Sequence, residues 1–152
     1  MAEFTAVAEQ TVEFGAPVIF TETTVRSQSG LVRHQDGTGL FNLVGFNDGN
    51  GCGCCCCQNN ETDYHVAFHA NIAVPDGGTV GEISLAVAVG GAVIPATLMS
   101  VTPTAATAYF NVGTDGITPV WDDCCQNLSI VNTSATAAPI LVRNARLAIN
   151  LP

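Results

Sequence analysis

Cysteine is the residue type of this chain with the most chemistry to offer, because it is concentrated in two short segments. Residues 50–60 read NGCGCCCCQNN, and residues 122–125 read DDCC. Clustered thiols can bind a metal ion, form disulfides or carry out redox chemistry. The candidates for disulfide or metal bonding are all seven cysteines: Cys52, Cys54, Cys55, Cys56, Cys57, Cys124 and Cys125.

A zinc site would need four thiolates that converge on one ion, usually from two C-x-x-C pairs. Cys54 and Cys57 have this spacing, and Cys124 or Cys125 could complete the set. Neighbouring cysteines in an extended chain point in opposite directions, however, so a run of four does not converge easily. Zinc stays an open alternative. A redox enzyme is not indicated, since its C-x-x-C begins a helix within a βαβ unit and no such pattern surrounds these residues.

Disulfides suit the alternating directions of the cysteine run better. One side of the run could reach Cys124 or Cys125 while the other side faces a neighbouring subunit. Seven is an odd number, so at least one thiol is free or bonded outside its own chain. If Leu98–Thr102 is a strand of its own, the two segments fall at the same end of a sandwich; if not, they fall at opposite ends. The sequence leaves this open, together with a loop of reduced cysteines.

Two histidines lie in the segment TDYHVAFHAN, whose apolar residues alternate with polar ones. This alternation places Tyr64, Val66 and Phe68 on a core face and His65 and His69 on the opposite face. The two histidines are four residues apart on a strand, about 13 Å, which is too far to share one metal ion. We interpret them as surface or interface residues, whose contacts would make assembly pH-sensitive because histidine titrates near neutrality.

The composition argues against several classes of function. With four basic and 13 acidic residues, the net charge of −9 offers no cationic surface for nucleic acid. No apolar run approaches the roughly 20 residues of a membrane-spanning helix, and MAEFTAVAEQ lacks the features of a secretory signal. Catalytic motifs such as G-x-S-x-G, H-E-x-x-H and the P-loop are absent, so we predict no enzyme. Because only 11% of the residues are charged, we expect much of the surface to be buried against copies of the chain.

Short β-branched stretches separated by Gly, Pro, Asn and Asp recur along the chain, and no helical periodicity stands out. EISLAVAVGGAVIPA predicts a hairpin, with Gly90 and Gly91 at the turn positions that need positive φ. The predicted strands are Val18–Thr24, Gly30–Gln35, Leu40–Gly45, Asp63–Val74, Val80–Val89, Ala92–Pro95, Ala106–Val112, Ile117–Trp121, Cys125–Val131 and Ile140–Ile149.

This pattern predicts an all-β chain with a single-domain jelly-roll β-sandwich of about 8–10 antiparallel strands. We assign the jelly roll to residues 17–152 and an N-terminal arm to residues 1–16. The arm has few turn residues, and it either extends to a neighbour or is a disordered tail.

Several segments resemble a family of small proteins encoded by Gram-positive anaerobes and their phages. They are LVRHQDGTGLFNLVG, NIAVPDGGTVGEISLAVAVGGAVIPATLMSVTP, AYFNV, DDCCQNLSIVNTS and LVRNARLAI. The resemblance runs from about Val18 to Ile149. It implies a jelly roll similar to the trimeric tumour-necrosis-factor and complement-type domains, and a role as a virion or cell-surface subunit. It implies no catalytic residue.

The resulting hypothesis is a homo-oligomeric structural protein, a phage capsid decoration or appendage subunit, with a trimer favoured. It would be made in the cytoplasm and act in a virion or on an extracellular surface, with itself and capsid or other virion proteins as partners. The cysteines would staple it by disulfides, and His65 and His69 would contact a neighbour. We expect no cofactor, and the one alternative left open is zinc at the cysteine segment.

Two alternatives use the same fold. One is an extracellular filament subunit, which would form long polymers when expressed alone. The other is a receptor- or carbohydrate-binding head, which would stack sugars on exposed aromatic rings. A cluster of Trp121 with Tyr109 at one exposed end would favour the second alternative.

Overall fold

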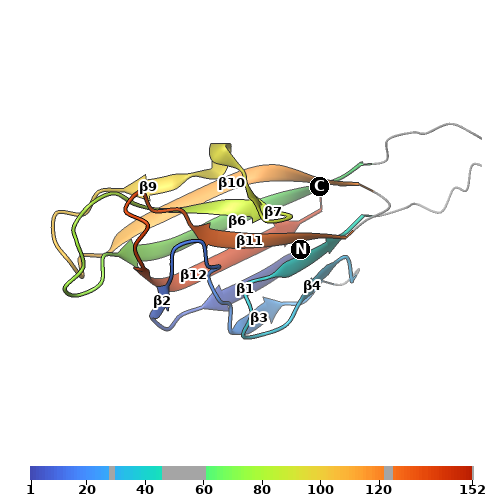
Figure 1. Cartoon of the computed structure of the whole chain (residues 1–152). Coiled ribbons are helices and arrows are strands. Elements are labelled where there is room, and N and C mark those ends of the chain that lie inside the picture. The colour runs from blue at the N-terminus through green and yellow to red at the C-terminus, as the bar shows by residue number, and fades with distance from the viewer. Residues whose placement is uncertain (28–29, 46–60, 122–124, 152) are drawn as a thin grey trace, which may run out of the picture.

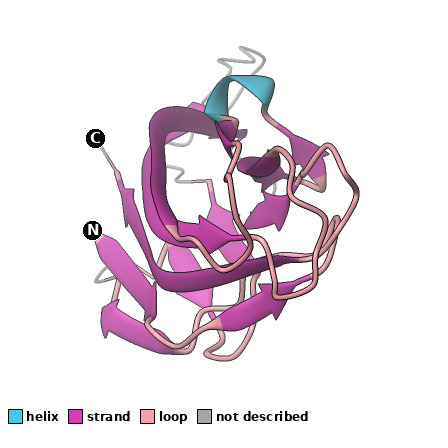
Figure 2. Cartoon of the chain, turned by 90° about the vertical axis from the view of Figure 1, so that its left-hand side faces the viewer, coloured by secondary structure: helices cyan, strands magenta, loops and turns pink. Residues whose placement is uncertain are grey.

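Alternating apolar and polar residues build two antiparallel sheets that pack face to face (Figure 1). The computed structural model describes residues 1–27, 30–45, 61–121 and 125–151. Figure 2 shows the strands of both sheets curving around a common interior. In the part of the chain described, no helix is long and apolar enough to cross a membrane.

Sheet A has the strand order β10-β6-β12-β1-β3, and β2 pairs with β12. Its strands are β1 (Ala2–Ala6), β2 (Gln10–Val12), β3 (Glu22–Val25), β6 (Glu61–Ala73), β10 (Phe110–Trp121) and β12 (Ile140–Asn150).

Sheet B has the order β4-β5-β11-β7-β8, and β9 pairs with β7. Its strands are β4 (Val32–His34), β5 (Phe41–Val44), β7 (Ile83–Val89), β8 (Ala92–Val93), β9 (Met99–Val101) and β11 (Cys125–Asn132). A single 3-10 turn, η1 (Pro95–Thr97), separates β8 from β9. The predicted all-β sandwich is therefore confirmed. The described residues form twelve strands rather than about 8–10, because pairs such as β1 and β2 are short and separate.

The core lies between the sheets and follows the predicted alternation. Tyr64, Val66 and Phe68 of β6 are buried, as are Phe41 and Leu43 of β5 on the facing sheet. The hairpin between β7 and β8 is confirmed as well, with φ of 59° at Gly90 and 82° at Gly91.

The N-terminal residues differ from the expected arm, because β1 lies inside sheet A between β12 and β3. Ala2 stands opposite Ile149 on β12, and the side chains of Ala2, Phe4 and Ala6 are buried. Alanine has a weak strand preference, and this strand's main partner follows more than a hundred residues later. The local sequence therefore gave little indication that residues 1–16 belong to the sandwich.

One long strand, β10, replaces the two strands predicted at residues 106–112 and 117–121. Gly113, Gly116 and Pro119 all lie within it and suggested a break. β10 stands at the edge of sheet A, where a proline removes no ladder hydrogen bond.

The described residues on either side of the two cysteine segments lie at the same end of the sandwich. Val44, before the first segment, stands opposite Cys125, which follows the second. Glu61 and Trp121, the other two flanking residues, also stand opposite each other. The strands that connect the two segments differ from those predicted. β8 and β9 both run antiparallel to β7 and act as one interrupted strand, and β10 is one continuous strand instead of two. Figure 1 shows both chain termini at this same end.

Candidate functional site

The outer face of sheet A, turned away from the core, combines small and polar side chains in cross-strand rows. One row runs from Thr5 through Arg146 and His69 to Gly113, and the next from Glu3 through Ala148 and Ala67 to Asp115. We define the sheet A outer face by these residues and their neighbours: Glu3, Thr5, His65, Ala67, His69, Asn71, Gly113, Asp115, Ile117, Arg146 and Ala148.

A β-bulge in β12 keeps two arginines on this side of the sheet. Arg143 pairs with Asn71 and Arg146 with His69, so three steps on β12 match two on β6. Asn144, within the bulge, has a φ of 51°, a conformation that asparagine tolerates better than most residues. Without the extra residue, Arg146 would point into the core, because side chains alternate along a strand.

Two contacts between ionisable side chains cross from strand to strand on the sheet A outer face. A guanidinium nitrogen of Arg146 lies 2.6 Å from Oε2 of Glu3 on the adjacent strand. This hydrogen bond lowers the pKa of Glu3 below its ordinary value, which keeps the carboxylate charged. His65 Nε2 lies 3.5 Å from Asp115 Oδ2 on β10. Glu3 and Arg146 are thus paired near the middle of the face, whereas the exposed carboxylates of Glu22 on β3 and Asp63 on β6, on the same side of the sheet, have no ion pair among the described residues.

The structure places both predicted interface histidines on this face. The His65 side chain is 41% exposed, and His69 is exposed between Gly113 and Arg146. Ile117, on the neighbouring strand, is 66% exposed, an unusual position for a large apolar side chain. The face thus offers paired charges, small residues and one uncovered apolar group.

Most of the predicted cysteine site lies outside the described residues. Cys125 begins β11 and is an exposed free thiol. Among the described residues, no group of three or more His, Cys, Asp and Glu side chains is arranged to hold a metal ion. The candidates beyond the described residues are Cys52, Cys54, Cys55, Cys56, Cys57 and Cys124.

The aromatic cluster expected of a carbohydrate-binding head does not form. Tyr109 directly precedes β10 and Trp121 ends it, so their backbones lie at opposite ends of a 12-residue strand. The Tyr109 ring instead packs against Arg143, whose guanidinium carbon lies 3.6 Å from the ring centroid. The Tyr109 hydroxyl donates a hydrogen bond to Glu9. These contacts attach the segment before β10 to β12 and to the N-terminal segment.

The Tyr109 phenol should therefore lose its proton at a higher pH than an ordinary tyrosine does. Burial and the hydrogen bond to the Glu9 carboxylate raise its pKa to about 12, from an ordinary value near 10. Because the folded-state pKa is the higher one, the stability from this neutral phenol is present below about pH 10 and is lost as the pH rises toward 12. Absorbance of tyrosinate in Tyr64→Phe, which leaves Tyr109 as the one tyrosine, should show a midpoint near 12. Glu9→Gln in the same background should lower this midpoint, and a midpoint near 10 before that change would contradict the assignment.

No family model and no curated protein matches the chain. Among solved structures, the globular domain of zebrafish complement 1qA protein superposes with a TM-score of 0.65, at 12% identity, over 99% of this chain and 94% of that chain. An isomalto-dextranase of Arthrobacter globiformis T6, complexed with panose, has a TM-score of 0.34 at 14% identity over 95% of this chain and 22% of its own. The first likeness confirms the complement-type jelly roll as the fold of this chain. The second is too distant to carry an argument.

Proposed function

We propose that this chain is a non-enzymatic structural subunit that forms a closed homo-oligomer, a trimer in the simplest arrangement, through the sheet A outer face. The observation that carries the proposal is the pairing of charges on this face. Burying a charge is costly unless it is already paired. Glu3 and Arg146 enter an interface as a pair, and His65 pairs with Asp115 when its imidazole is protonated, so less desolvation opposes association.

The shape of the face supports the same proposal. Ala67 and Ala148 stand side by side at its centre, so a second copy can approach closely. Ile117 is exposed and would be covered on association, which removes apolar surface from water. Closed symmetric assemblies are the usual outcome when one chain associates with itself.

The setting we propose is a phage virion, as a capsid decoration or appendage subunit, or an extracellular surface reached after synthesis in the cytoplasm. Capsid or other virion proteins would be the further partners. This setting is supported by the sequence resemblance of residues 18–149 and by the low share of charged residues, 11%. In an oxidising environment the cysteines would staple the assembly. The same-end position of Val44, Glu61, Trp121 and Cys125 supports contact between the two cysteine segments.

Ala67→Glu is expected to convert the oligomer to a monomer. The added carboxylate would point out of the centre of the sheet A outer face, next to Asp115, where a second copy would bury it unpaired. An unpaired buried charge costs several kcal/mol, enough to abolish association at micromolar concentration. Sedimentation velocity in the presence of reductant measures the masses of wild type and variant.

Ala92→Glu is the matched control, because Ala92 is an exposed strand residue on β8 of the other sheet. It should leave the oligomer intact. A monomeric wild type would contradict self-association, and an Ala67→Glu oligomer of unchanged mass would place the interface elsewhere. Long polymers of the wild type would support the filament alternative. After exposure to air, denaturing electrophoresis without reductant should show covalent oligomers that reductant separates.

A further inference from the structure

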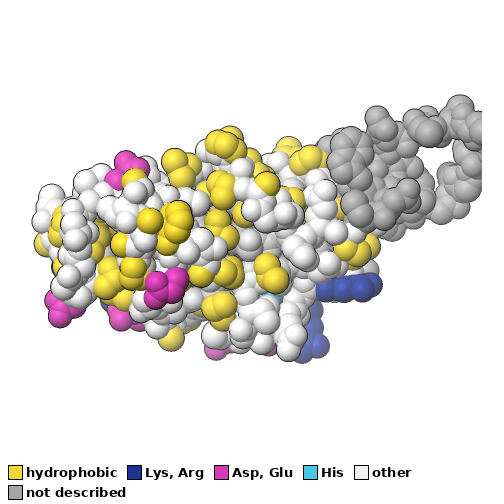
Figure 3. Space-filling model, viewed as in Figure 1, with side chains coloured by type: hydrophobic (Ala, Val, Ile, Leu, Met, Phe, Trp, Pro, Cys, Tyr) yellow, Lys and Arg dark blue, Asp and Glu magenta, His cyan; other side chains and the backbone are white. Residues whose placement is uncertain are grey.

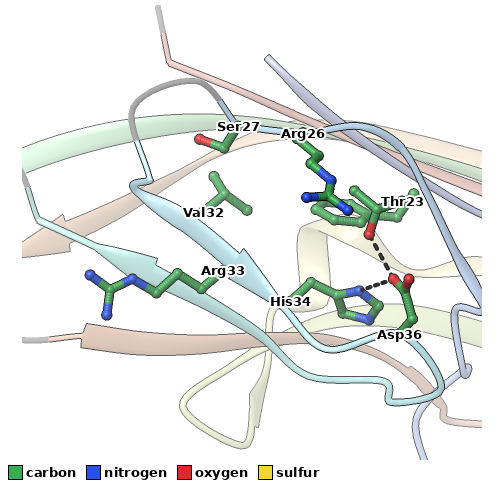
Figure 4. Close-up of a pocket in the computed structure, with 8 residues that line it drawn as sticks. Thr23, Arg26, Ser27, Val32, Arg33, His34 and Asp36 are labelled. Atoms are coloured by element: carbon green, nitrogen blue, oxygen red, sulfur yellow. Dashed lines mark hydrogen bonds and ion pairs between the residues drawn. The ribbon is translucent and has the colours of Figure 1, made fainter.

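A pocket of about 390 Å³ opens where the edges of the two sheets meet, between β3 and β4 (Figure 4). Its volume is in the range of small-molecule sites. Phe4 and Val32 contribute apolar surface, and the polar residues that carry the argument are Thr23, Arg26, His34 and Asp36. None of the site features described above involves this pocket.

The His34 imidazole is buried and has one nitrogen without a hydrogen-bond partner. Its side chain is 0% exposed, and its ring stacks on Phe41 with centroids 4.3 Å apart and planes inclined by 14°. Nε2 lies 3.1 Å from the Thr38 carbonyl oxygen, which can only accept, so Nε2 carries the proton. In the neutral ring, Nδ1 is then an acceptor, and it is a buried polar atom that has no hydrogen-bond partner. Buried acceptors without a donor are rare in native structures.

Asp36 lies beside this nitrogen, at the distance of an ion pair when the imidazole is protonated. Its Oδ1 lies 3.5 Å from His34 Nδ1 and accepts a hydrogen bond from the Thr23 hydroxyl at 2.7 Å (Figure 4). The Asp36 side chain is 57% exposed, so a bound molecule can reach it. The pocket therefore presents an exposed carboxylate with a buried imidazole behind it, and the two oxygens of a carboxylate suit a ligand with neighbouring hydroxyl donors.

Arg26 contributes a positive charge to the pocket, opposite in sign to that of Asp36. Among the described residues, its guanidinium makes no hydrogen bond or ion pair. In Figure 4 the Arg26 side chain reaches toward Thr23, whereas Arg33 extends the other way. Arg33 donates from Nε to the Gly30 carbonyl at 3.3 Å. Figure 3 shows the basic side chains on its face gathered at the end of the molecule where both termini lie, and most carboxylates away from it.

The charges of the pocket select the class of ligand. Apart from His34, two arginines and one aspartate give the lining a net charge of +1, in a chain of net charge −9. A ligand with one negative charge and neutral donors matches this lining, whereas a zwitterion or a cation does not. A metal ion fits poorly, because only His34 and Asp36 are good ligands here and Arg26 would repel it.

We propose that this pocket binds an acidic sugar, a monosaccharide unit that carries a carboxylate and neighbouring hydroxyl groups. The carboxylate pairs with Arg26, and neighbouring hydroxyls donate to the exposed Asp36 carboxylate. The apolar side of the sugar ring lies on Phe4 and Val32. Recognition then depends on charge and hydrogen bonds rather than on exposed aromatic rings.

The test uses the full-length chain, labelled with ¹⁵N and kept reduced, titrated with glucuronate. We expect saturable shifts of the Thr23, His34 and Asp36 amide signals, and a shift of the His34 Nδ1 resonance as the neighbouring Asp36 carboxylate accepts hydrogen bonds from the ligand. Glucose has the hydroxyls without the charge, and acetate has the charge without the hydroxyls. Each should bind at least about tenfold more weakly, since a hydrogen bond to a charged group is worth that much or more.

Arg26→Gln should weaken glucuronate binding by at least about tenfold without changing the rest of the spectrum. Arg143→Gln is the matched control, because this arginine lies on β12 beside Tyr109, away from the pocket, and binding should be unchanged. The proposal is overturned if glucuronate produces no saturable shift, if glucose or acetate binds as tightly, or if Arg26→Gln has no effect. Ala67→Glu should bind glucuronate as the wild type does, so a failure of the proposed assembly is distinguishable from a failure of this site.

Discussion

Asn132→Ala is expected to lower the free energy of unfolding by about 3–5 kcal/mol, because four buried or part-buried polar groups each lose a hydrogen bond together. The Asn132 side chain donates to the carbonyls of Val12 and Ala138, both at 2.9 Å. Its Oδ1 accepts from the backbone N–H of Ser134 at 3.0 Å and from the Ser134 hydroxyl at 2.6 Å. Asn132 and Ser134 are each 1% exposed, so water has little access to replace these hydrogen bonds.

Urea unfolding followed by circular dichroism measures this loss, with reductant present throughout. Asn42→Ala is the control, because Asn42 makes one exposed side-chain hydrogen bond, at 3.3 Å, to Asn127. It should change the stability by less than about 0.5 kcal/mol. An Asn132→Ala variant as stable as this control would mean that Asn132 does not connect β2 to the turn after β11 as described.

Phe41→Ala is expected to cost about 3–5 kcal/mol through loss of transfer free energy and creation of a cavity. Phe41 is 0% exposed and lies at the centre of an aromatic cluster. Its ring centroid is 4.6 Å from that of Phe4, 5.2 Å from that of Phe20 and 4.3 Å from that of His34. For a chain of 152 residues this loss corresponds to a fall in Tm of about 6–20 °C.

Phe14→Ala removes the same ring from a position that is 53% exposed, and it should leave Tm nearly unchanged. Differential scanning calorimetry measures both variants. Equal shifts for the two would show that Phe41 is not part of the core. Phe41→Leu, which refills most of the volume, should recover a large part of the lost stability.

The parts of the fold that local sequence predicts are those with strong local patterns. The alternation in β6 placed Tyr64 and Phe68 in the core and His65 and His69 outside. The pair Gly90-Gly91 located the hairpin, because few other residues adopt positive φ there. Both features depend only on neighbouring residues.

Features that depend on distant residues were not predictable from one sequence. β1 was not predicted because its main partner strand, β12, lies more than a hundred residues away in the sequence, so the residues near β1 do not indicate the pairing. His34 was missed as a candidate residue although the spacing of His34 and Asp36, two apart before a glycine turn, was visible. Its burial follows from Phe4, Phe20 and Phe41, which come from three separate segments. Arg26 likewise joins the pocket only when β3 and β4 come together.

The position of β1 also determines when the domain can fold. Thr5 stands opposite Arg146 on β12, so β1 must wait until β12 has been synthesised before sheet A can close. β6 also lacks one of its two partner strands, β12, until the same moment. Chains dominated by such long-range pairing fold in roughly milliseconds to seconds. During synthesis, the unpaired early strands depend on the nascent chain's own solubility or on chaperones for protection from aggregation.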